Sequence, residues 1–370
     1  MSKIRLGMIG SGDISRRYFE QAAKLEDVEF VATYSRKLEN AERKAAEHGV
    51  PRWYDDYRQL LDREELDAVV VTTPHSLHAE PVIAALERGL HVLNEKPMAT
   101  SFEDCAQMVY LAEQQGKIFM SLPYDQNPAM LAAARYLDEA YIGKITGAEA
   151  QLSLPGPPRD NWYYDRSVSH GGAVLDCLVY PVSRIVALLG PAVSVIAEVN
   201  TLIPNRIVGG GKRVNSDVDD NVSLIVEFSG GQHAVIRTLW GMSLKQNNTI
   251  LYGRKGTIAL GDSGFPLVIH SPDQPLPDAE SVTWRGNTDC YVPHATIAAM
   301  PNESMIAHFA QCIRTGTQPA QSGRQQLHVH EIMFGAYRSA ETGRRYKLTT
   351  TFDHGDKLKP DIFDTRSDFI

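Results

Sequence analysis

Two ionisable side chains stand four residues apart in an otherwise apolar segment, Ala173-Val-Leu-Asp-Cys-Leu-Val-Tyr-Pro181. On a helix, this spacing places Asp176 and Tyr180 on one face. A buried polar group without a partner costs about 1 to 3 kcal/mol, so each is expected to be partnered or functional. A nearby ammonium group favours the deprotonated form of a tyrosine, which can then take a proton from a substrate hydroxyl. Lys96 would supply that ammonium group. We therefore predict these three as catalytic residues; a structural aspartate with a satisfied core tyrosine is the alternative.

A glycine-rich motif, Gly10-Ser-Gly-Asp-Ile-Ser15, lies between a short apolar run and an amphipathic stretch. In a strand-to-helix turn, the first glycine permits the tight turn and the second lets the backbone approach a pyrophosphate. Ser15 stands where a third glycine is usual. The motif predicts dinucleotide binding, with a ligand-free βα turn as the alternative. The predicted contact residues are Gly10, Ser11, Gly12, Asp13 and Ile14.

The segment expected beside the adenosine ribose, Tyr34-Ser-Arg-Lys37, contains no carboxylate. A carboxylate there usually binds the 2′-hydroxyl of NAD, whereas a guanidinium and a hydroxyl suit the 2′-phosphate of NADP. Ser35, Arg36 and Lys37 thus favour NADP(H), with NAD(H) possible, unless Arg36 and Lys37 are only a solvated surface pair.

His75 and His78 are three residues apart and have no third ligand, which makes an incomplete zinc site. We therefore predict no metal. Further cofactor contacts are expected from Thr73, Pro74, His75, His78, Glu95 and Lys96.

An aromatic and charged loop, residues 162–166, comes just before a glycine pair at 171–172. Aromatic rings stack on the apolar face of a pyranose, while polar groups bind its hydroxyls. We therefore expect a small sugar or polyol as substrate, although a loop packed over a domain interface would have the same composition. The predicted substrate-binding residues are Lys96, Tyr124, Trp162, Tyr163, Arg166, His170, Asp176 and Tyr180.

Hydrophobic patterning predicts the elements that position these residues. Apolar runs at 4–9, 28–34, 68–73, 91–93 and 118–121 alternate with amphipathic stretches such as 79–88 and 102–115, which predicts a parallel sheet covered by helices on both faces. Beyond about residue 145, longer β-like runs predict a mostly antiparallel sheet with a hairpin at Ser229-Gly-Gly-Gln232 and helices near 172–189, 303–315 and 326–341. Pro181 cannot donate a backbone bond to Cys177, which predicts a kink at Tyr180.

Composition limits the class of protein. The chain has 370 residues, 43% hydrophobic and 22% charged, with a formal charge of -8. These values suit two globular domains and argue against a nucleic-acid or membrane partner. No apolar run reaches the roughly 20 residues needed to cross a bilayer, and no signal peptide is visible. Four cysteines without a CxxC pair indicate reduced thiols and a cytoplasmic location.

The motifs together, in their order along the chain, resemble the Gfo/Idh/MocA oxidoreductases over nearly the whole length. The resemblance rests on residues 10–15, 73–78, 95–97 and 171–176, with supporting segments at 251–257 and 339–343. It implies a doubly wound Rossmann domain, residues 1–124, and an α+β domain, residues 125–370, which binds substrate and whose large open sheet often makes oligomer contacts. A homodimer or homotetramer is therefore expected.

The resemblance also implies NAD(P)-dependent hydride transfer at a secondary alcohol or ketone carbon of a sugar, polyol or glycoside. Lys96 would hold the substrate oxygen, and Asp176 would orient the substrate and relay protons. Tyr180 stands where many members have histidine, and Asp125 where many have arginine, so no member's substrate can be transferred. Two alternatives remain open: a glycoside-cleaving enzyme with tightly bound NAD(H), acting by transient oxidation and elimination, and a non-catalytic cofactor or sugar sensor.

Overall fold

The computed structural model describes residues 2–123, 128–138, 141–158, 162–261, 267–270, 280–284, 287–291 and 304–354. The chain divides into two compact units. The first comprises residues 1–124 and 303–330, and the second residues 125–302 and 331–370. The sequence predicts one break near residue 124, whereas here the segment 303–330 joins the first unit. Hydrophobic patterning could not assign that segment to a unit, because the apolar face of a helix does not show which core it packs against.

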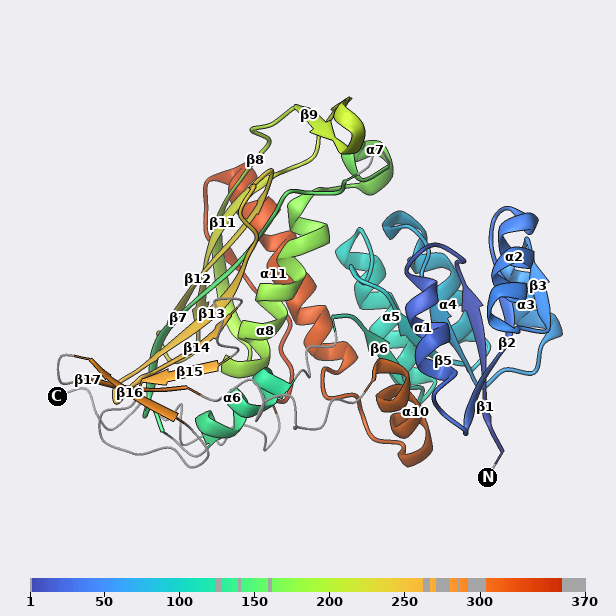
Figure 1. The fold of residues 1–370 in the computed structure, drawn as a ribbon, viewed down its shortest axis with the longest axis horizontal. Helices are drawn as coiled ribbons and strands as arrows, with labels where there is room; N and C mark the ends of the chain where they lie inside the picture. The colour runs from blue at the N-terminus through green and yellow to red at the C-terminus, as the bar shows by residue number, and fades with distance from the viewer. Residues whose placement is uncertain are drawn as a thin grey trace. The chain divides into compact units, whose positions relative to one another are not determined.

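The first unit contains a six-stranded parallel sheet with the order β3-β2-β1-β4-β5-β6 (Figure 1). This is the doubly wound order, and its crevice for ligands lies at the carboxyl ends of the central strands. The strands are β1 Ile4–Ile9, β2 Val28–Tyr34, β3 Arg52–Tyr54, β4 Ala68–Val71, β5 His91–Asn94 and β6 Phe119–Ser121. The helices are α1 Ser15–Ala22, α2 Leu38–His48, α3 Tyr57–Arg63, α4 Ala79–Glu87, α5 Phe102–Gln114 and α10 Met305–Thr315, with a 3₁₀ turn at His75–Leu77.

Alternate residues of the central strands face different helical layers. Leu6 and Met8 of β1 lie in one core with Tyr18 of α1 and Phe309 of α10. Gly7, between them, faces the other layer, where an added Cβ would come within 2.9 Å of Leu60 in α3. Helix α10 thus packs on the same layer as α1, although it lies almost 300 residues further along the chain. This parallel domain confirms the fold class predicted for the start of the chain.

The second unit is built on a ten-stranded sheet with the order β16-β17-β15-β14-β13-β7-β12-β11-β8-β18. All neighbouring strands are antiparallel except β7 and β12, so the predicted mostly antiparallel sheet is confirmed. Helices α8 and α11 lie along the same face of the sheet (Figure 1). The strands are β7 Ile145–Leu154, β8 Ala192–Asn200, β11 Asn221–Phe228, β12 His233–Trp240, β13 Gln246–Gly253, β14 Thr257–Gly261, β15 Leu267–His270, β16 Glu280–Trp284, β17 Asn287–Tyr291 and β18 Tyr346–Lys347.

The remaining elements of this unit are a small hairpin and several helices. They are β9 Asn205–Val208 and β10 Lys212–Asn215, the helices α6 Pro128–Asp138, α7 Arg166–Ser169, α8 Val179–Leu189 and α11 Gly323–Thr342, the 3₁₀ turns Trp162–Tyr164 and Gly209–Gly211, and a π-helical turn at Val174–Leu178. No helix in the described ranges is both long and apolar enough to cross a membrane.

Two local predictions are confirmed and one strand was missed. The sequence predicts Ser101 as the N-cap of the helix over 102–115, and its Oγ accepts a hydrogen bond from the Asp104 N–H at 3.1 Å. The hairpin between β11 and β12 is also confirmed, with Gly231 at a φ of 81°. Strand β3 was missed because it is a short edge strand whose Arg52 and Trp53 are exposed, which leaves no apolar run to detect.

Candidate functional site

The turn between β1 and α1 is open on the side where a ligand would approach. Gly10 has a φ of 113°, and an added Cβ would lie 2.7 Å from the Thr72 carbonyl carbon. A side chain is therefore excluded at position 10 both by conformation and by space. At Gly12 an added Cβ would meet nothing within 4 Å. The neighbouring protein atoms thus do not demand glycine at position 12, whereas a pyrophosphate approaching the backbone would.

Two serines hold this turn in place without filling it. Ser11 Oγ donates a hydrogen bond to Tyr34 O at 2.8 Å, and buried Ser15 Oγ donates to Gly12 O at 2.7 Å. Helix α1 has no acidic residue in its first turn and no side-chain cap, so its partial positive charge faces the open turn. Asp13 and Ile14 are exposed beside it. These residues fit the pyrophosphate of a dinucleotide.

The tip of β2 carries two exposed cations after a half-buried serine. The Ser35 N–H donates to Tyr54 O at 3.1 Å, which anchors the backbone of the tip to β3. Arg36 and Lys37 extend from this anchored point into solvent. The chemistry of the tip therefore suits a phosphate better than a ribose hydroxyl.

The segment after β4 holds its shape through its own contacts. Thr73 Oγ1 donates to Leu77 O at 2.8 Å, Pro74 starts the 3₁₀ turn, and His75 is 4% exposed. His78 is fully buried, with Nδ1 2.7 Å from Pro97 O and Nε2 2.8 Å from Thr73 O. Because both ring nitrogens face backbone carbonyls, His78 helps to hold the turn that carries Lys96, and its cofactor contact stays a prediction.

Glu95 is also used internally. The Tyr18 hydroxyl donates to Glu95 Oε1 at 2.6 Å, and the Lys96 N–H donates to Oε2 at 3.0 Å. With Glu95 8% exposed and its carboxylate bonded on both oxygens, the side chain supports the turn, and its cofactor contact also stays a prediction. Lys96 is the only residue between 95 and 98 that is not buried. The turn therefore presents the Lys96 side chain from a rigid base.

His330 of α11 completes that base from a distant part of the sequence. Its Nε2 accepts a hydrogen bond from the Met98 N–H at 2.7 Å, and its Nδ1 lies 2.7 Å from Gln326 O. An imidazole that accepts at one nitrogen and donates at the other is neutral. Burial lowers the pKa of His330 to about 4, with the nearby His78 acting in the same direction.

This histidine predicts a pH dependence of stability. The unfolded pKa is 6.5 and the folded pKa about 4, so the unfolded chain binds more protons between these values and stability falls as the pH falls. We expect His330 to account for about 2 kcal/mol of unfolding free energy lost between pH 7.5 and pH 5. His330→Gln should reduce the dependence of the unfolding free energy on pH, measured by urea denaturation, while His233→Gln, at an exposed histidine, should leave it unchanged. If the unfolding free energy fell equally with pH in His330→Gln and in wild type, His330 would not be the source of the pH dependence.

In the second unit, Asp176 and Tyr180 lie on a buried helix but are not themselves buried. Their neighbours Leu175, Cys177, Leu178 and Val179 are almost completely buried, whereas the two ionisable residues are partly exposed. They therefore mark one accessible stripe, as the four-residue spacing predicts. A π-helical turn at residues 174–178 comes just before α8, which contains Tyr180 and Pro181; the kink at Tyr180 stays a prediction. Such turns often occur at functional sites.

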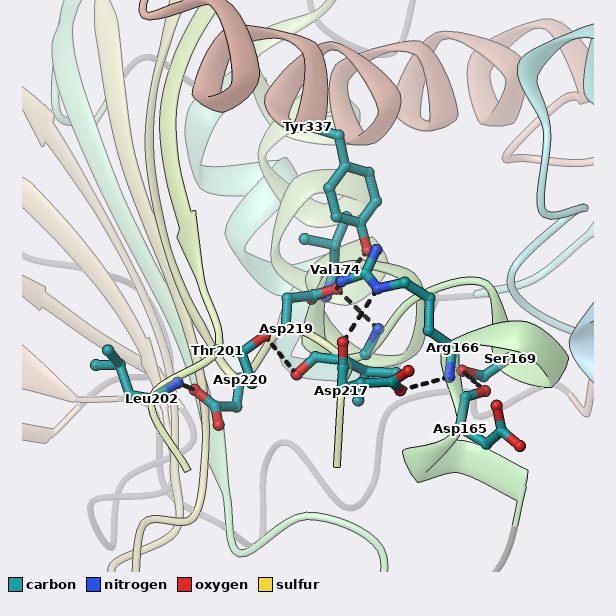
Figure 2. Close-up of polar contacts among 12 residues, drawn as sticks. Asp165, Arg166, Ser169, Val174, Thr201, Leu202, Asp217, Asp219, Asp220 and Tyr337 are labelled. Atoms are coloured by element: carbon teal, nitrogen blue, oxygen red, sulfur yellow. Dashed lines mark hydrogen bonds and ion pairs between the residues drawn. The ribbon is translucent and has the colours of Figure 1, made fainter. Parts of the chain in front are cut away.

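The loop before this helix separates into structural and accessible residues. Tyr164 is buried and donates its hydroxyl to Pro157 O, and Asp165 caps α7 by accepting from the Ser167 N–H at 2.9 Å. Trp162 and Tyr163 stack with ring centroids 4.0 Å apart and are both partly exposed. Arg166 is also exposed, close to Asp217 and Asp219 (Figure 2). Tyr124 lies outside the described residues.

His170 has the left-handed backbone conformation, with a φ of 62°. It is the one described residue other than glycine with a positive φ. The conformation ends helix α7, where the His170 N–H donates to Arg166 O at 2.9 Å. A side chain kept at such a strained position is a recognised sign of function.

Sequence reasoning missed three residues that support the candidate site. They are His330, Asp219 and Tyr337, none of which was given a role from the sequence. No local motif could reveal them, because their partners are 45 to 232 residues away along the chain. Among the described residues, no group of three or more histidine, cysteine and acidic side chains could hold a metal ion.

A doubly wound sheet with an open glycine turn, joined to an α+β unit with an antiparallel sheet, defines a dinucleotide-dependent oxidoreductase. Residues 4–122 match the oxidoreductase family with an NAD-binding Rossmann fold, and residues 130–259 match the GFO/IDH/MocA C-terminal domain. The chain belongs to the Gfo/Idh/MocA family of NAD(P)-dependent oxidoreductases. The resemblance noted in the sequence is thereby confirmed.

Named relatives of this chain are sugar reductases. The chain is 26% identical to 1,5-anhydro-D-fructose reductase of Ensifer adhaerens, over 94% of this chain and 99% of the relative. It is 30% identical to dTDP-3,4-didehydro-2,6-dideoxy-alpha-D-glucose 3-reductase of Streptomyces antibioticus, over 73% and 79% of the two chains. The enzyme of the same name from Actinomadura kijaniata is 34% identical, but the match spans only 56% of this chain and 63% of that one.

Solved structures share the fold over nearly the full length. Levoglucosan dehydrogenase in complex with NADH and L-sorbose superimposes with a TM-score of 0.82 and 22% identity, over 95% of this chain and all of that one. The aldose-aldose oxidoreductase of Caulobacter crescentus has a TM-score of 0.77 and 22% identity. At this identity the likeness supports the fold.

Proposed function

We propose that this protein is an NADP-preferring dehydrogenase or reductase that acts on a secondary alcohol or ketone carbon of a sugar or polyol. The observation that carries the proposal is the accessible stripe formed by Asp176 and Tyr180 on a helix whose other residues are mostly buried. The named relatives act on sugars, which supports the substrate class. None of them is a glycosidase or a sensor, so neither alternative is carried forward.

We assign one task to each catalytic residue. The bound nicotinamide supplies or accepts the hydride. Lys96 Nζ binds the substrate oxygen and stabilises negative charge that develops on it. Tyr180 Oη takes the hydroxyl proton during oxidation and returns it during reduction. Asp176 orients the substrate and relays the proton.

The substrate contacts proposed in the second unit follow from accessibility. Trp162 and Tyr163 offer a stacked aromatic surface for the apolar face of a pyranose. Arg166 and His170 are exposed beside them and can bind hydroxyls. Tyr124 stays in the proposal from sequence alone.

We propose that the Arg36 and Lys37 cations select NADP(H) over NAD(H). The anchored, carboxylate-free tip of β2 supports this choice. The remaining cofactor contacts that we propose are Gly10, Ser11, Gly12, Asp13, Ile14, Ser35, Thr73, Pro74, His75, His78, Glu95 and Lys96.

The test is a panel of sugars and polyols assayed with NAD and NADP by absorbance of the reduced nicotinamide. We expect at least one member to be turned over, with a higher kcat/KM for NADP than for NAD. Cofactor binding without turnover across the panel would contradict the substrate class. Cleavage of a glycoside without net conversion of added cofactor would favour the transient-oxidation alternative instead.

We also propose that the exposed face of the large sheet binds a second copy of the chain. Ile196, Ile225 and Val235 are direct cross-strand neighbours on that face and are 38%, 41% and 49% exposed. Exposed Glu149 pairs with Val235 in register, and exposed Arg237 lies two residues along β12. A row of apolar residues flanked by an acidic and a basic side chain suits a two-fold contact, in which the same surface of two subunits meets. This contact would give a homodimer or, with another interface, a homotetramer.

Placing a charge in this row should dissociate the oligomer. We expect wild type to elute as a dimer or tetramer and Ile225→Lys as a monomer in size-exclusion chromatography with light scattering. Leu244→Lys, at a 67% exposed apolar residue outside the row, is the matched control and should keep the wild-type mass. A monomeric wild type would overturn the proposal.

We further propose a division of labour and a location. Residues 1–124, joined by the segment 303–330, would form the cofactor-binding unit, and the rest of residues 125–370 the substrate-binding and oligomerisation unit. A cytoplasmic location is supported by Cys105, Cys177 and Cys312, which are buried and not in disulfides. Burial raises the pKa of the Cys105 thiol well above its ordinary value, which keeps it unreactive.

A further inference from the structure

Asp219 is a buried carboxylate directed at the start of the helix that carries Asp176. It is 1% exposed. Its Oδ1 accepts from the Gly172 N–H at 2.9 Å, and its Oδ2 accepts from the Val174 N–H at 2.7 Å. Its backbone oxygen accepts from the Ala173 N–H at 2.8 Å. One residue therefore satisfies three consecutive N–H groups of a helix start, where such groups have no partner within the helix.

Tyr337 of α11 secures this carboxylate from the other side. Its hydroxyl donates to Asp219 Oδ1 at 2.6 Å, and in Figure 2 the ring points down from α11 onto Asp219. Burial, together with the adjacent Asp219 carboxylate, raises the pKa of Tyr337 well above 10, so the hydroxyl remains a donor. Arg166 Nη2 lies 3.8 Å from the same Oδ1 and supplies a compensating positive charge.

The glycine pair before the helix is explained by this contact. A Cβ on Gly172 would lie 2.1 Å from the Asp219 backbone oxygen, and a Cβ on Gly171 would lie 2.3 Å from the Tyr337 hydroxyl. Neither glycine has a positive φ in the structure. Both are therefore required by close approach of Asp219 and Tyr337, independently of any ligand.

The contact is one helical turn from the catalytic stripe. The Asp176 N–H donates to Gly172 O at 2.9 Å, so a shift of Gly172 moves Asp176 directly. Tyr180 follows on the same accessible stripe. We propose that Asp219, held by Tyr337, is a positioning residue that sets the location of Asp176 and Tyr180 by binding the first turn of their helix. This inference rests on the function proposed above.

The test compares Asp219→Asn with Asp220→Asn. An amide nitrogen cannot accept, so the first variant sets a donor against one of the N–H groups at the helix start. Asp220 is the matched control: it is 2% exposed and accepts from the Leu202 N–H, the Ile203 N–H and Arg206, but makes no contact with the helix start. Both variants lose one buried charge with comparable partners, and their Tm values are measured to keep assays below unfolding.

We expect Asp219→Asn to lower kcat by about tenfold or more, as a misplacement of reacting groups would, while the Kd for NADPH stays unchanged. Hydrogen exchange of the amides at 172–178 should become faster in Asp219→Asn and remain slow in Asp220→Asn. Tyr337→Phe is the milder variant, and should lower kcat less and add little to Asp219→Asn in the double mutant. The proposal is overturned if Asp220→Asn lowers kcat equally, or if Asp219→Asn speeds exchange with kcat unchanged. A wild type that turns over no panel substrate contradicts the proposed function instead, and the exchange comparison still decides whether Asp219 holds the helix.

Discussion

Lys96→Ala is expected to lower kcat by about a thousandfold, because it removes the cation that we propose stabilises charge on the reacting oxygen. NADPH should still bind, since the glycine turn and the β2 tip are untouched. The turn itself should persist, because Glu95, Asn94 and His330 bind its backbone and not the Lys96 side chain. Single-turnover kinetics and NADPH fluorescence titration measure the two effects separately.

Lys117→Ala is the matched control for this variant. Lys117 is a partly exposed lysine of the same unit, just before β6. We expect it to retain wild-type kcat. Wild-type kcat in Lys96→Ala would show that Lys96 does not take part in the reaction, and a lost NADPH affinity would move its role to cofactor binding.

Tyr180→Phe is expected to lower kcat by about a hundredfold to a thousandfold, since it removes only the hydroxyl that we propose exchanges the substrate proton. In the oxidation direction, wild-type kcat should rise with pH as the base loses its proton, and this rise should be absent in the variant. The ring is retained, so KM for substrate should change little. Steady-state kinetics across pH measure all three quantities.

Two further variants separate chemistry from packing at this position. Tyr180→His restores a group that can take a proton, and we expect part of kcat to return with the rise moved to lower pH, because histidine has the lower pKa. Tyr252→Phe removes a tyrosine hydroxyl from β13 and should leave kcat unchanged. A Tyr180→Phe enzyme with the wild-type pH profile would assign the proton transfer to another residue.

Much of the first unit could be predicted, because the sequence patterns that indicate its structure involve residues close together in the chain. The glycine turn, the carboxylate-free β2 tip and the Ser101 cap each depend on residues within a few positions of one another. Hydrophobic alternation also predicted the parallel sheet, and β3 was missed because an exposed edge strand has no apolar run. The supporting contacts of His78 and Glu95 were not predicted, since sequence shows that a polar residue is near a ligand edge but not what its atoms contact.

In the second unit, the four-residue spacing of Asp176 and Tyr180 was enough to predict one accessible stripe. The glycine pair after the aromatic loop could also be recognised in the sequence, but the reason why glycine is required there could not. Asp219 and Tyr337 approach it from 47 and about 165 residues further along the chain. The loop residues showed the same limit, because Tyr164 turns inward and Asp165 caps α7 while Trp162 and Tyr163 remain accessible.

The sequence by itself determined which chemistry could be proposed for this protein: a turn for a pyrophosphate, cations for a ribose phosphate, and the side chains Lys96, Asp176 and Tyr180 for catalysis. These follow from residue type and short-range spacing, which the chain carries wherever it folds. Only the tertiary structure decided which polar groups remain accessible and which support the site through internal hydrogen bonds. His330 beneath the Lys96 turn and Asp219 at the helix start are supports of this kind. Their roles arise from hydrogen bonds between distant segments, and such bonds exist only once burial has removed water as the competing partner.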